Sequence, residues 1–242
     1  MSGNQLPATP VAGLLGCDVS KFQLEVDFPK LVEVGIAFGY IREGESNWRE
    51  GDDRWAINWP AAHAAGLPCG PYHPPHGGSS GRDQARILRD RCRDWEHGRD
   101  LRPAIDLEVK GTPVEVAEEM AEEILALFGV LPVVYTGKWF ARAIGLGRSS
   151  ILAQCPLWLA AYVSPPPALP DAWDDWTIWQ FSGSGRLPGI TTDVDLNVIR
   201  SAAALDMLRD VSRVGPPETM RSPGADPAPM ATAAQDAWRD VT

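Results

Sequence analysis

The chain has little positive charge for its size. Lys and Arg together number 22 against 32 Asp and Glu in 242 residues, which gives a formal net charge of -10. Nucleic acids and anionic membrane surfaces both attract basic proteins, so this balance argues against either partner. No apolar run approaches the length of a membrane span, and we expect no membrane insertion. The N-terminus also lacks the basic and apolar segments of a secretory signal, which predicts synthesis in the cytoplasm without an export signal.

The sequence is also poor in patterns that hold metals. Four cysteines are scattered, with no C-x-x-C pair and no histidine at zinc spacing: Cys17, Cys69, Cys92 and Cys155. We therefore expect free, buried thiols rather than a disulfide or zinc framework. His73 and His76 could be a metal pair, but the prolines between them and the lack of a nearby acid cluster in sequence argue against it. There is no G-x-S-x-G motif for a serine nucleophile, and we expect no metal and no other cofactor.

What the chain does contain is enough apolar sequence for one large core. The apolar fraction is 44%, and β/α barrels commonly occupy about 200 to 250 residues. Ten tryptophans are many for this length. Trp is largely buried on average, so most should be core, while any exposed ring would suit the apolar face of a sugar.

Hydrophobic periodicity and turn residues predict alternating strands and helices early in the chain and mainly strands later. Thr112 and Glu115 form a capping-box pattern with Pro113 at the first helical position, and Gly129 should end that helix. The expected strands are 14–20, 36–42, 67–73, the run around 102–109, 132–136, 156–162, 176–182 and 193–198. The expected helices are 28–34, 54–65, 82–97 stopped by Gly98, the one before Gly129, and 202–211.

This order of elements predicts an α/β fold, a β/α barrel whose C-terminal units have lost most of their helices. We expect a flexible lead over residues 1–12 and the barrel over 13–212. Residues 213–242 form a tail rich in Pro and Ala, with a possible short terminal helix.

The tripeptide Asp106-Leu107-Glu108 lies in an apolar run that resembles a strand. Residues two apart on a strand point to the same face, so both carboxylates should lie side by side. Two acids on an apolar strand are costly unless something uses them. Glycoside hydrolysis needs such a pair, one acid held protonated beside an ionised carboxylate. The alternative is structural, in which these acids cap a helix or pair with Arg.

Further polar residues occupy comparable positions on other predicted strands. Asp18 follows the first strand's apolar residues, and Asp195 with Asn197 lies in the last strand. If these strands are parallel members of one barrel, their carboxyl ends converge on the face where barrel enzymes carry out their chemistry. The acids therefore predict one shared site.

A series of ordered motifs resembles a known family. The motifs are Gly16-Cys-Asp18-Val-Ser20, Gly66-Leu-Pro-Cys-Gly70-Pro-Tyr72-His73, Ala104-Ile-Asp106-Leu-Glu108, Val133-Val-Tyr135-Thr, Pro156-Leu-Trp158-Leu-Ala-Ala-Tyr162, Trp176-Thr-Ile-Trp179-Gln180, Pro188-Gly-Ile and Asp193-Val-Asp195-Leu-Asn197. Over roughly residues 13–200 this set is similar to glycoside hydrolase family 25, the Chalaropsis-type lysozymes. The resemblance implies a barrel of about eight strands and a muramidase that cuts the β-1,4 bond between N-acetylmuramic acid and N-acetylglucosamine in bacterial peptidoglycan.

The resemblance also implies roles for single residues. Glu108 matches the general acid/base. Asp106 matches the second carboxylate, either as the nucleophile or as a group that orients the substrate's 2-acetamido group. The remaining matched positions are Asp18 and Asp195 as further acids, Tyr72 and Tyr135 near the scissile bond, and Trp179 and Gln180 in the wall of the sugar cleft.

One stretch departs from the family pattern. After its second strand the family usually has Lys-x-Ser/Thr-Glu-Gly, whereas this chain has Arg42-Glu43-Gly44-Glu45-Ser46. Glu45 is kept and is expected to bind substrate, but Arg42 presents a planar fork of donors where Lys has a compact charge. The contact made at this point should therefore differ.

Three functions remain open from the sequence. The first is a bacteriolytic muramidase, most simply a phage endolysin released to the wall through a holin. The second is a glycan-binding or structural barrel that kept the cleft and lost turnover; retention of all four acids argues against it. The third is a related barrel hydrolase acting on another glycan.

Overall fold

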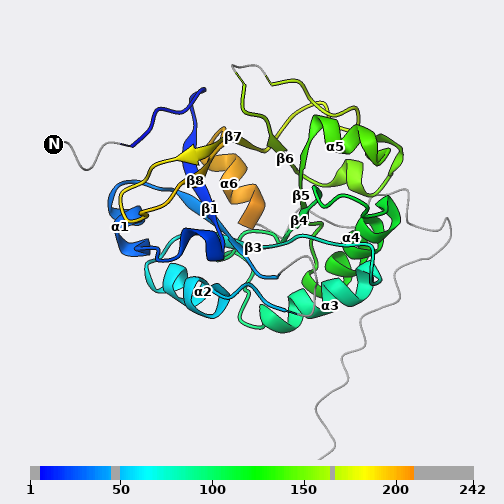
Figure 1. Cartoon of the computed structure of the whole chain (residues 1–242), viewed down its shortest axis with the longest axis horizontal. Coiled ribbons are helices and arrows are strands. Elements are labelled where there is room, and N and C mark those ends of the chain that lie inside the picture. The colour runs from blue at the N-terminus through cyan, green and yellow to red at the C-terminus, as the bar shows by residue number, and fades with distance from the viewer. Residues whose placement is uncertain (1–5, 45–49, 164–166, 210–242) are drawn as a thin grey trace, which may run out of the picture.

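The computed structural model describes residues 6–44, 50–163 and 167–209. Within them, eight strands close into one barrel in sequence order, surrounded by helices (Figure 1). The strands are β1 (Leu14–Val19), β2 (Phe38–Arg42), β3 (Cys69–His73), β4 (Ala104–Asp106), β5 (Val133–Gly137), β6 (Leu157–Ala160), β7 (Ile178–Gly185) and β8 (Val194–Ile199). The predicted α/β barrel is confirmed.

The helices are concentrated in the first two thirds of the chain. They are α1 (Phe28–Glu33), α2 (Trp55–Ala64), α3 (Gly81–Arg91), α4 (Val114–Phe128), α5 (Lys138–Ala143) and α6 (Ala202–Arg209), with 3₁₀ turns η1 (Lys21–Gln23), η2 (Leu146–Arg148) and η3 (Leu152–Gln154). In the described residues no helix lies between β6 and β7 or between β7 and β8, as the sequence predicted. None of the described helices is both long and apolar enough to cross a bilayer.

Strand direction differs from a fully parallel barrel at one position. β1 to β7 are parallel to their neighbours in order, but β8 is antiparallel to both β7 and β1. The barrel thus closes with one reversed strand. The chain from β7 to β8 is short, which suits an antiparallel connection, because a parallel one needs a crossover of about a dozen residues or more.

Two helix boundaries were predicted wrongly. α3 ends at Arg91 instead of His97, because Trp95 turns into the core and donates its Nε1 hydrogen to the Leu101 carbonyl at 2.8 Å. The predicted capping box on α4 does not form. Thr112 instead donates its hydroxyl to the Pro75 carbonyl at 2.9 Å, a long-range contact that fixes the loop after β3. Gly129 does end α4 in the left-handed conformation, at φ 73°.

The barrel interior is apolar at one end and polar at the other. Phe38 and Tyr40 of β2 point inward, and Tyr40 packs on Trp158 of β6 with ring centroids 4.6 Å apart. β1 comes close to this layer through Gly16, where an added Cβ would lie 2.4 Å from the Phe38 ring. Leu205 and Leu208 of α6 join the same cluster and cover the end of the barrel where the parallel strands begin (Figure 1). The opposite end is left for polar side chains.

The four cysteines lie in this packed structure as free, buried thiols, as predicted.

Candidate active site

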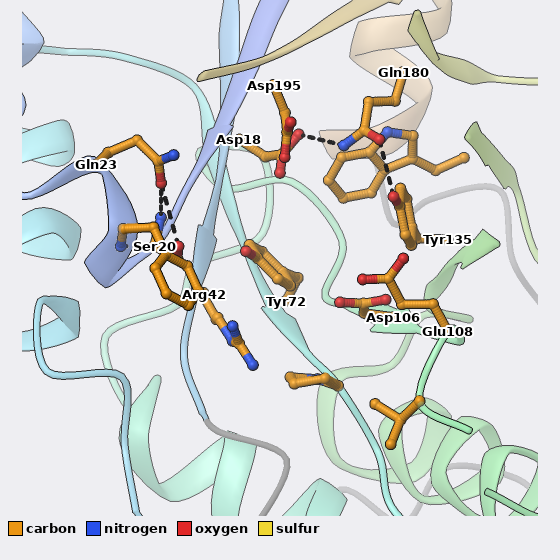
Figure 2. Close-up of a pocket in the computed structure, with 14 residues that line it drawn as sticks. Asp18, Ser20, Gln23, Arg42, Tyr72, Asp106, Glu108, Tyr135, Gln180 and Asp195 are labelled. Carbon is orange, nitrogen blue, oxygen red and sulfur yellow. Dashed lines mark hydrogen bonds between the residues drawn. The ribbon is translucent and has the colours of Figure 1, made fainter. Parts of the chain in front are cut away.

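Polar side chains point into the barrel where the parallel strands end. On β2 the inward residues alternate as Phe38, Tyr40 and Arg42, so the strand period places Arg42 above the aromatic layer. The same alternation places Asp18, Tyr72 and Asp106 at this end. Together these residues line a cavity of about 290 Å³, whose wall is completed by Ser20, Phe22, Gln23, Pro74, Glu108, Val109, Tyr135, Trp158, Gln180 and Asp195 (Figure 2).

Asp195 reaches the cavity by a different route from the one expected. Because β8 is antiparallel, Asp195 lies near the start of its strand and pairs in register with Asp18 of β1. The expectation that only carboxyl ends converge is therefore wrong for this strand. The reversal still places the two carboxylates side by side.

The carboxyl groups of Asp106 and Glu108 also lie close together for a different reason from the one predicted. β4 ends at Asp106, and Glu108 follows in a turn, so strand alternation does not place it. The turn is fixed by Leu107, which is fully buried, donates its backbone N–H to the Tyr135 carbonyl at 2.8 Å and accepts the Thr136 hydroxyl at 3.1 Å. Both carboxyl groups face the cavity nonetheless (Figure 2).

Asp106 and Glu108 have different surroundings. Asp106 is 7% exposed, and its Oδ1 has no hydrogen-bond partner among the described residues. Burial, with the charges of Glu108 and Asp18, holds the pKa of Asp106 well above its usual range against the opposing charge of Arg42. Glu108 lies at the exposed mouth, yet partial desolvation and Asp18 raise its pKa too, opposed by Arg42 and by the neighbouring Tyr135 hydroxyl. The two acids titrate as a pair, so a proton is held in the cavity above the usual carboxylic range.

Asp18 and Asp195 form a second acid pair. Burial and the neighbouring Asp195 raise the pKa of Asp18 well above its usual range, although Asn197 and Gln180 stabilise its ionised form. The pKa of Asp195 is raised by burial and by Glu108 and Asp106, while a hydrogen bond with Asp18 opposes the shift. Each carboxyl disfavours the ionised form of the other, so the ionisation on this side of the cavity belongs to the pair rather than to either residue alone.

A hydrogen-bond network runs from Asp18 through Gln180 to Tyr135, on the side of the cavity where Glu108 lies (Figure 2). Asp18 Oδ2 accepts from Gln180 Nε2 at 3.0 Å and from Asn197 Nδ2 at 2.7 Å. Gln180 Oε1 in turn accepts the hydroxyls of Tyr135 at 2.9 Å and Tyr162 at 2.7 Å. Gln180 is therefore locked in one amide orientation, and it fixes Tyr135 beside Glu108.

Trp179 does not line the cavity, contrary to the expectation from sequence. It precedes Gln180 on β7, so the strand period turns it outward. There it is fully buried among Trp176, Leu159 and Val198 and donates Nε1 to the Ala161 carbonyl. Glu45, the other expected substrate contact, lies outside the described residues.

Three residues that the sequence did not assign to the site take part in it. Trp158 lines the cavity from β6, and its Nε1 donates to Asn197 Oδ1 at 2.8 Å, which orients Asn197 toward Asp18. Tyr162 holds Gln180, and Arg42 supplies positive charge. The sequence signals for Trp158 and Tyr162 are their places in the aromatic motif that begins at Pro156. The signal for Arg42 is its place two residues after Tyr40 on the same face of β2.

Possible metal ligands lie elsewhere and are already engaged. The ligand atoms of His63, Cys69 and Asp100 lie within 4.8 Å of one another. The Asp100 carboxylate, however, already accepts from His63 Nε2 at 2.9 Å and from the Arg99 guanidinium. The two ring nitrogens of His73 lie 2.8 Å from Glu43 Oε2 and 3.2 Å from Gln84 Oε1.

Known proteins share both this sequence pattern and this architecture. The sequence signature described as glycosyl hydrolases family 25 matches residues 17–190. Lysozyme M1 from Streptomyces globisporus is 28% identical over 208 residues, covering 80% of this chain and 70% of that protein.

Solved structures of similar proteins have the same fold as this chain. The bacterial lysozyme from Streptomyces coelicolor is 27% identical, with a TM-score of 0.75 over 83% of this chain and 98% of that one. The catalytic domain of endolysin ply40 from bacteriophage P40 of Listeria monocytogenes, at 23% identity, shares the fold with a TM-score of 0.67 over 81% of this chain and 97% of that one. A family signature across most of the chain, a closed barrel and an acid-lined cavity at its open end therefore show that the chain belongs to glycosyl hydrolase family 25 and is a glycoside hydrolase of the lysozyme (muramidase) type.

Proposed function

We propose that this enzyme hydrolyses the β-1,4 bond between N-acetylmuramic acid and N-acetylglucosamine in bacterial peptidoglycan, with Glu108 as general acid/base and Asp106 as its partner carboxylate. The observation that supports this assignment is the pair itself: two carboxyls with raised pKa values face one cavity, one deeply buried and one at the mouth. Glycoside hydrolysis needs an acid that stays protonated near neutral pH beside a second carboxyl group.

In the first step, protonated Glu108 donates its proton to the glycosidic oxygen as the bond to the anomeric carbon breaks. Positive charge then develops on the sugar ring in the cavity that Asp18 and Asp195 line, where an ionised carboxylate of this pair lowers the free energy of the transition state. In the second step a water molecule gives one proton to Glu108 and its hydroxyl oxygen to the anomeric carbon, as the bond between that carbon and the oxygen that attacked it breaks. Glu108 is thereby returned to its protonated form.

Two roles for Asp106 fit between these steps. It could attack the anomeric carbon directly, or it could accept the N–H of the 2-acetamido group, whose carbonyl oxygen then attacks. The second role matches the buried Oδ1, which has no hydrogen-bond partner within the described chain and suits an N–H donor from the substrate. A thiazoline analogue of the sugar should inhibit strongly if the acetamido group is the nucleophile, and weakly if Asp106 attacks.

The test of the activity uses Gram-positive cell walls, with reducing-end labelling and mass spectrometry of the released fragments. The wild type should create reducing muramic acid ends, and Glu108→Gln should lower the rate about a hundredfold or more. Glu115→Gln, an exposed acid on α4, is the matched control and should be unchanged. Binding to walls without new ends would contradict the proposal, and new reducing glucosamine ends would assign a different bond.

We further propose that the enzyme reaches the wall as phage endolysins do, after synthesis in the cytoplasm and release through a holin. The shared fold with the bacteriophage P40 endolysin domain supports this setting. Expression inside a susceptible bacterium should leave the cells intact until a holin or a membrane-permeabilising agent is supplied, and turbidity should then fall. Lysis without permeabilisation would contradict it.

A further inference from the structure

The turn after β1 presents an exposed aromatic ring at the cavity. Phe22 lies in η1, is 63% exposed and is nevertheless one of the residues that line the cavity. A single exposed apolar side chain is common on protein surfaces and has no function by itself. Phe22 differs because its backbone is fixed by several buried contacts.

Ser20 and Gln23 form a capping box at this turn. Ser20 donates its backbone N–H to Gln23 Oε1 at 2.8 Å, and the Ser20 hydroxyl accepts the Phe22 N–H at 3.3 Å. Gln23, buried beneath the turn, donates Nε2 to the Asp193 carbonyl ahead of β8 at 3.0 Å. Lys21 donates its N–H to Asp52 Oδ2 at 2.9 Å. The turn is thus tied to two segments far apart in sequence.

The residue that leaves the turn is strained. Leu24 has φ 55° and ψ -89°, a conformation that a branched side chain adopts at a cost of about 1–3 kcal/mol. The side chain of Leu24 is 59% exposed, so core packing does not explain the strain. Such strain persists where surrounding contacts impose it, and here they are the contacts that hold Phe22 at the cavity.

We propose that Phe22 is a stacking platform for a pyranose ring of the glycan chain, a binding position separate from the acids that act on the scissile bond. The proposal rests on the function proposed above. In Figure 2, Ser20 and Gln23, which flank Phe22 in sequence, lie across the cavity from Tyr135 and Glu108, so a chain extending from the acids would meet the ring. The face of a β-1,4-linked pyranose carries axial C–H groups, and an aromatic ring carried on a fixed backbone contacts such a face without any ordering of the turn on binding.

The test measures hydrolysis of a purified octasaccharide of alternating N-acetylglucosamine and N-acetylmuramic acid. Phe22→Ala should raise KM about tenfold with kcat within about twofold, because the platform is used equally in ground and transition states. Phe22→Trp should restore KM. Ile57→Ala, which removes an apolar side chain 51% exposed on α2, is the matched control and should leave both constants unchanged.

A binding measurement separates this proposal from the proposed function. In the Glu108→Gln background, calorimetric titration with the same octasaccharide should show that adding Phe22→Ala weakens binding about tenfold. The binding measurement does not depend on turnover. If the wild-type enzyme made no reducing muramic acid ends, that result would contradict the proposed cleavage but would leave the stacking proposal to be decided by the titration. Unchanged KM and unchanged binding in Phe22→Ala would overturn the platform, as would a Trp variant that behaves like the Ala variant.

Discussion

Arg42 is the one basic residue among the described side chains that line the cavity, where it faces four acids. Its Nε donates to the Gly44 carbonyl at 2.9 Å, which holds the side chain at the end of β2. The positive charge opposes the rise in pKa of both Asp106 and Glu108. Arg42 therefore limits how far burial raises the pKa values of Asp106 and Glu108.

Replacing Arg42 should move the pH dependence of the enzyme. In Arg42→Gln the ionised forms of Asp106 and Glu108 lose a favourable charge, so both pKa values rise. The kcat/KM profile should then move to higher pH on both limbs, because the acidic limb follows the carboxyl that must be ionised, Asp106, and the alkaline limb follows the acid that must be protonated, Glu108. The measurement is kcat/KM on soluble glycan across pH 3–9. Arg93→Gln, which removes an exposed guanidinium far out on the surface, should leave the profile in place. An unchanged pH profile in Arg42→Gln would show that the charge of Arg42 does not affect the ionisation of Asp106 and Glu108.

At the level of single residues, the sequence predicted the acids better than the aromatics. Asp18, Asp106 and Asp195 interrupt apolar strands, and isolated acids in such runs are informative because burial without a use is costly. Trp158 and Trp179 both lie in aromatic motifs, and only the strand register decides which one faces inward. A one-residue change of register exchanges the two faces, so composition and motif alone could not choose between them.

A buried ion-pair network supports the elements behind the cavity. Glu43, which follows β2, is fully buried and pairs with His73 at the end of β3 and Arg91 at the end of α3. Burial alone would raise the pKa of Glu43, but His73 and Arg91 outweigh it and lower the pKa below its usual value. The network therefore links β2, β3 and α3 just outside the catalytic pocket.

Removing that carboxylate should destabilise the fold. Glu43→Gln leaves His73 and Arg91 without their shared anion and should lower the free energy of unfolding by about 2–4 kcal/mol, measured by urea denaturation at pH 7. Glu33→Gln, which breaks only the exposed pair with Lys30, should cost less than about 0.5 kcal/mol.

The pH dependence gives a second check on the same network. A carboxylate whose pKa is lowered by folding stabilises the protein above its unfolded pKa, and this stabilisation is lost as the pH falls through the folded pKa. Wild type should therefore lose more stability than Glu43→Gln between neutral and acidic pH. Parallel stability curves for the two proteins would contradict the assigned ion pair.

Elements with strong periodicity were predicted well, and those set by tertiary contacts were not. All eight strands and five of the six α-helices in the described chain lie close to their expected positions. The 3₁₀ turns span three residues each, too few to show a helical period, and the six-residue α5 was not predicted. The turn at Glu108 depends on Tyr135 and Thr136, which are distant in sequence, so local propensity could not reveal it.

For the molecule as a whole, the reversed direction of β8 was the main feature that the sequence did not show. Inward and outward residues alternate identically in parallel and antiparallel strands, so the pattern of β8 fits both. Closure in the observed direction pairs Asp195 with Asp18 and Asn197 with Gly16. The residue pattern therefore predicts that these acids face the barrel interior, but it does not determine the direction of the strand that carries Asp195.

The extent of the catalytic unit yields a prediction about the whole chain. The family signature ends at residue 190, the barrel closes with β8 at Ile199, and α6 runs to Arg209. Deleting residues 213–242, which lie outside the described part, should leave kcat/KM on soluble glycan within about twofold and the melting temperature nearly unchanged.

A deletion from residue 202 is the informative contrast, because it removes Leu205 and Leu208 from the inner core, and loss of two buried leucines costs about 2–5 kcal/mol each. If the shorter deletion also abolished activity or folding, the last thirty residues would belong to the catalytic unit; if it reduced activity only on intact walls, they would contribute to wall binding.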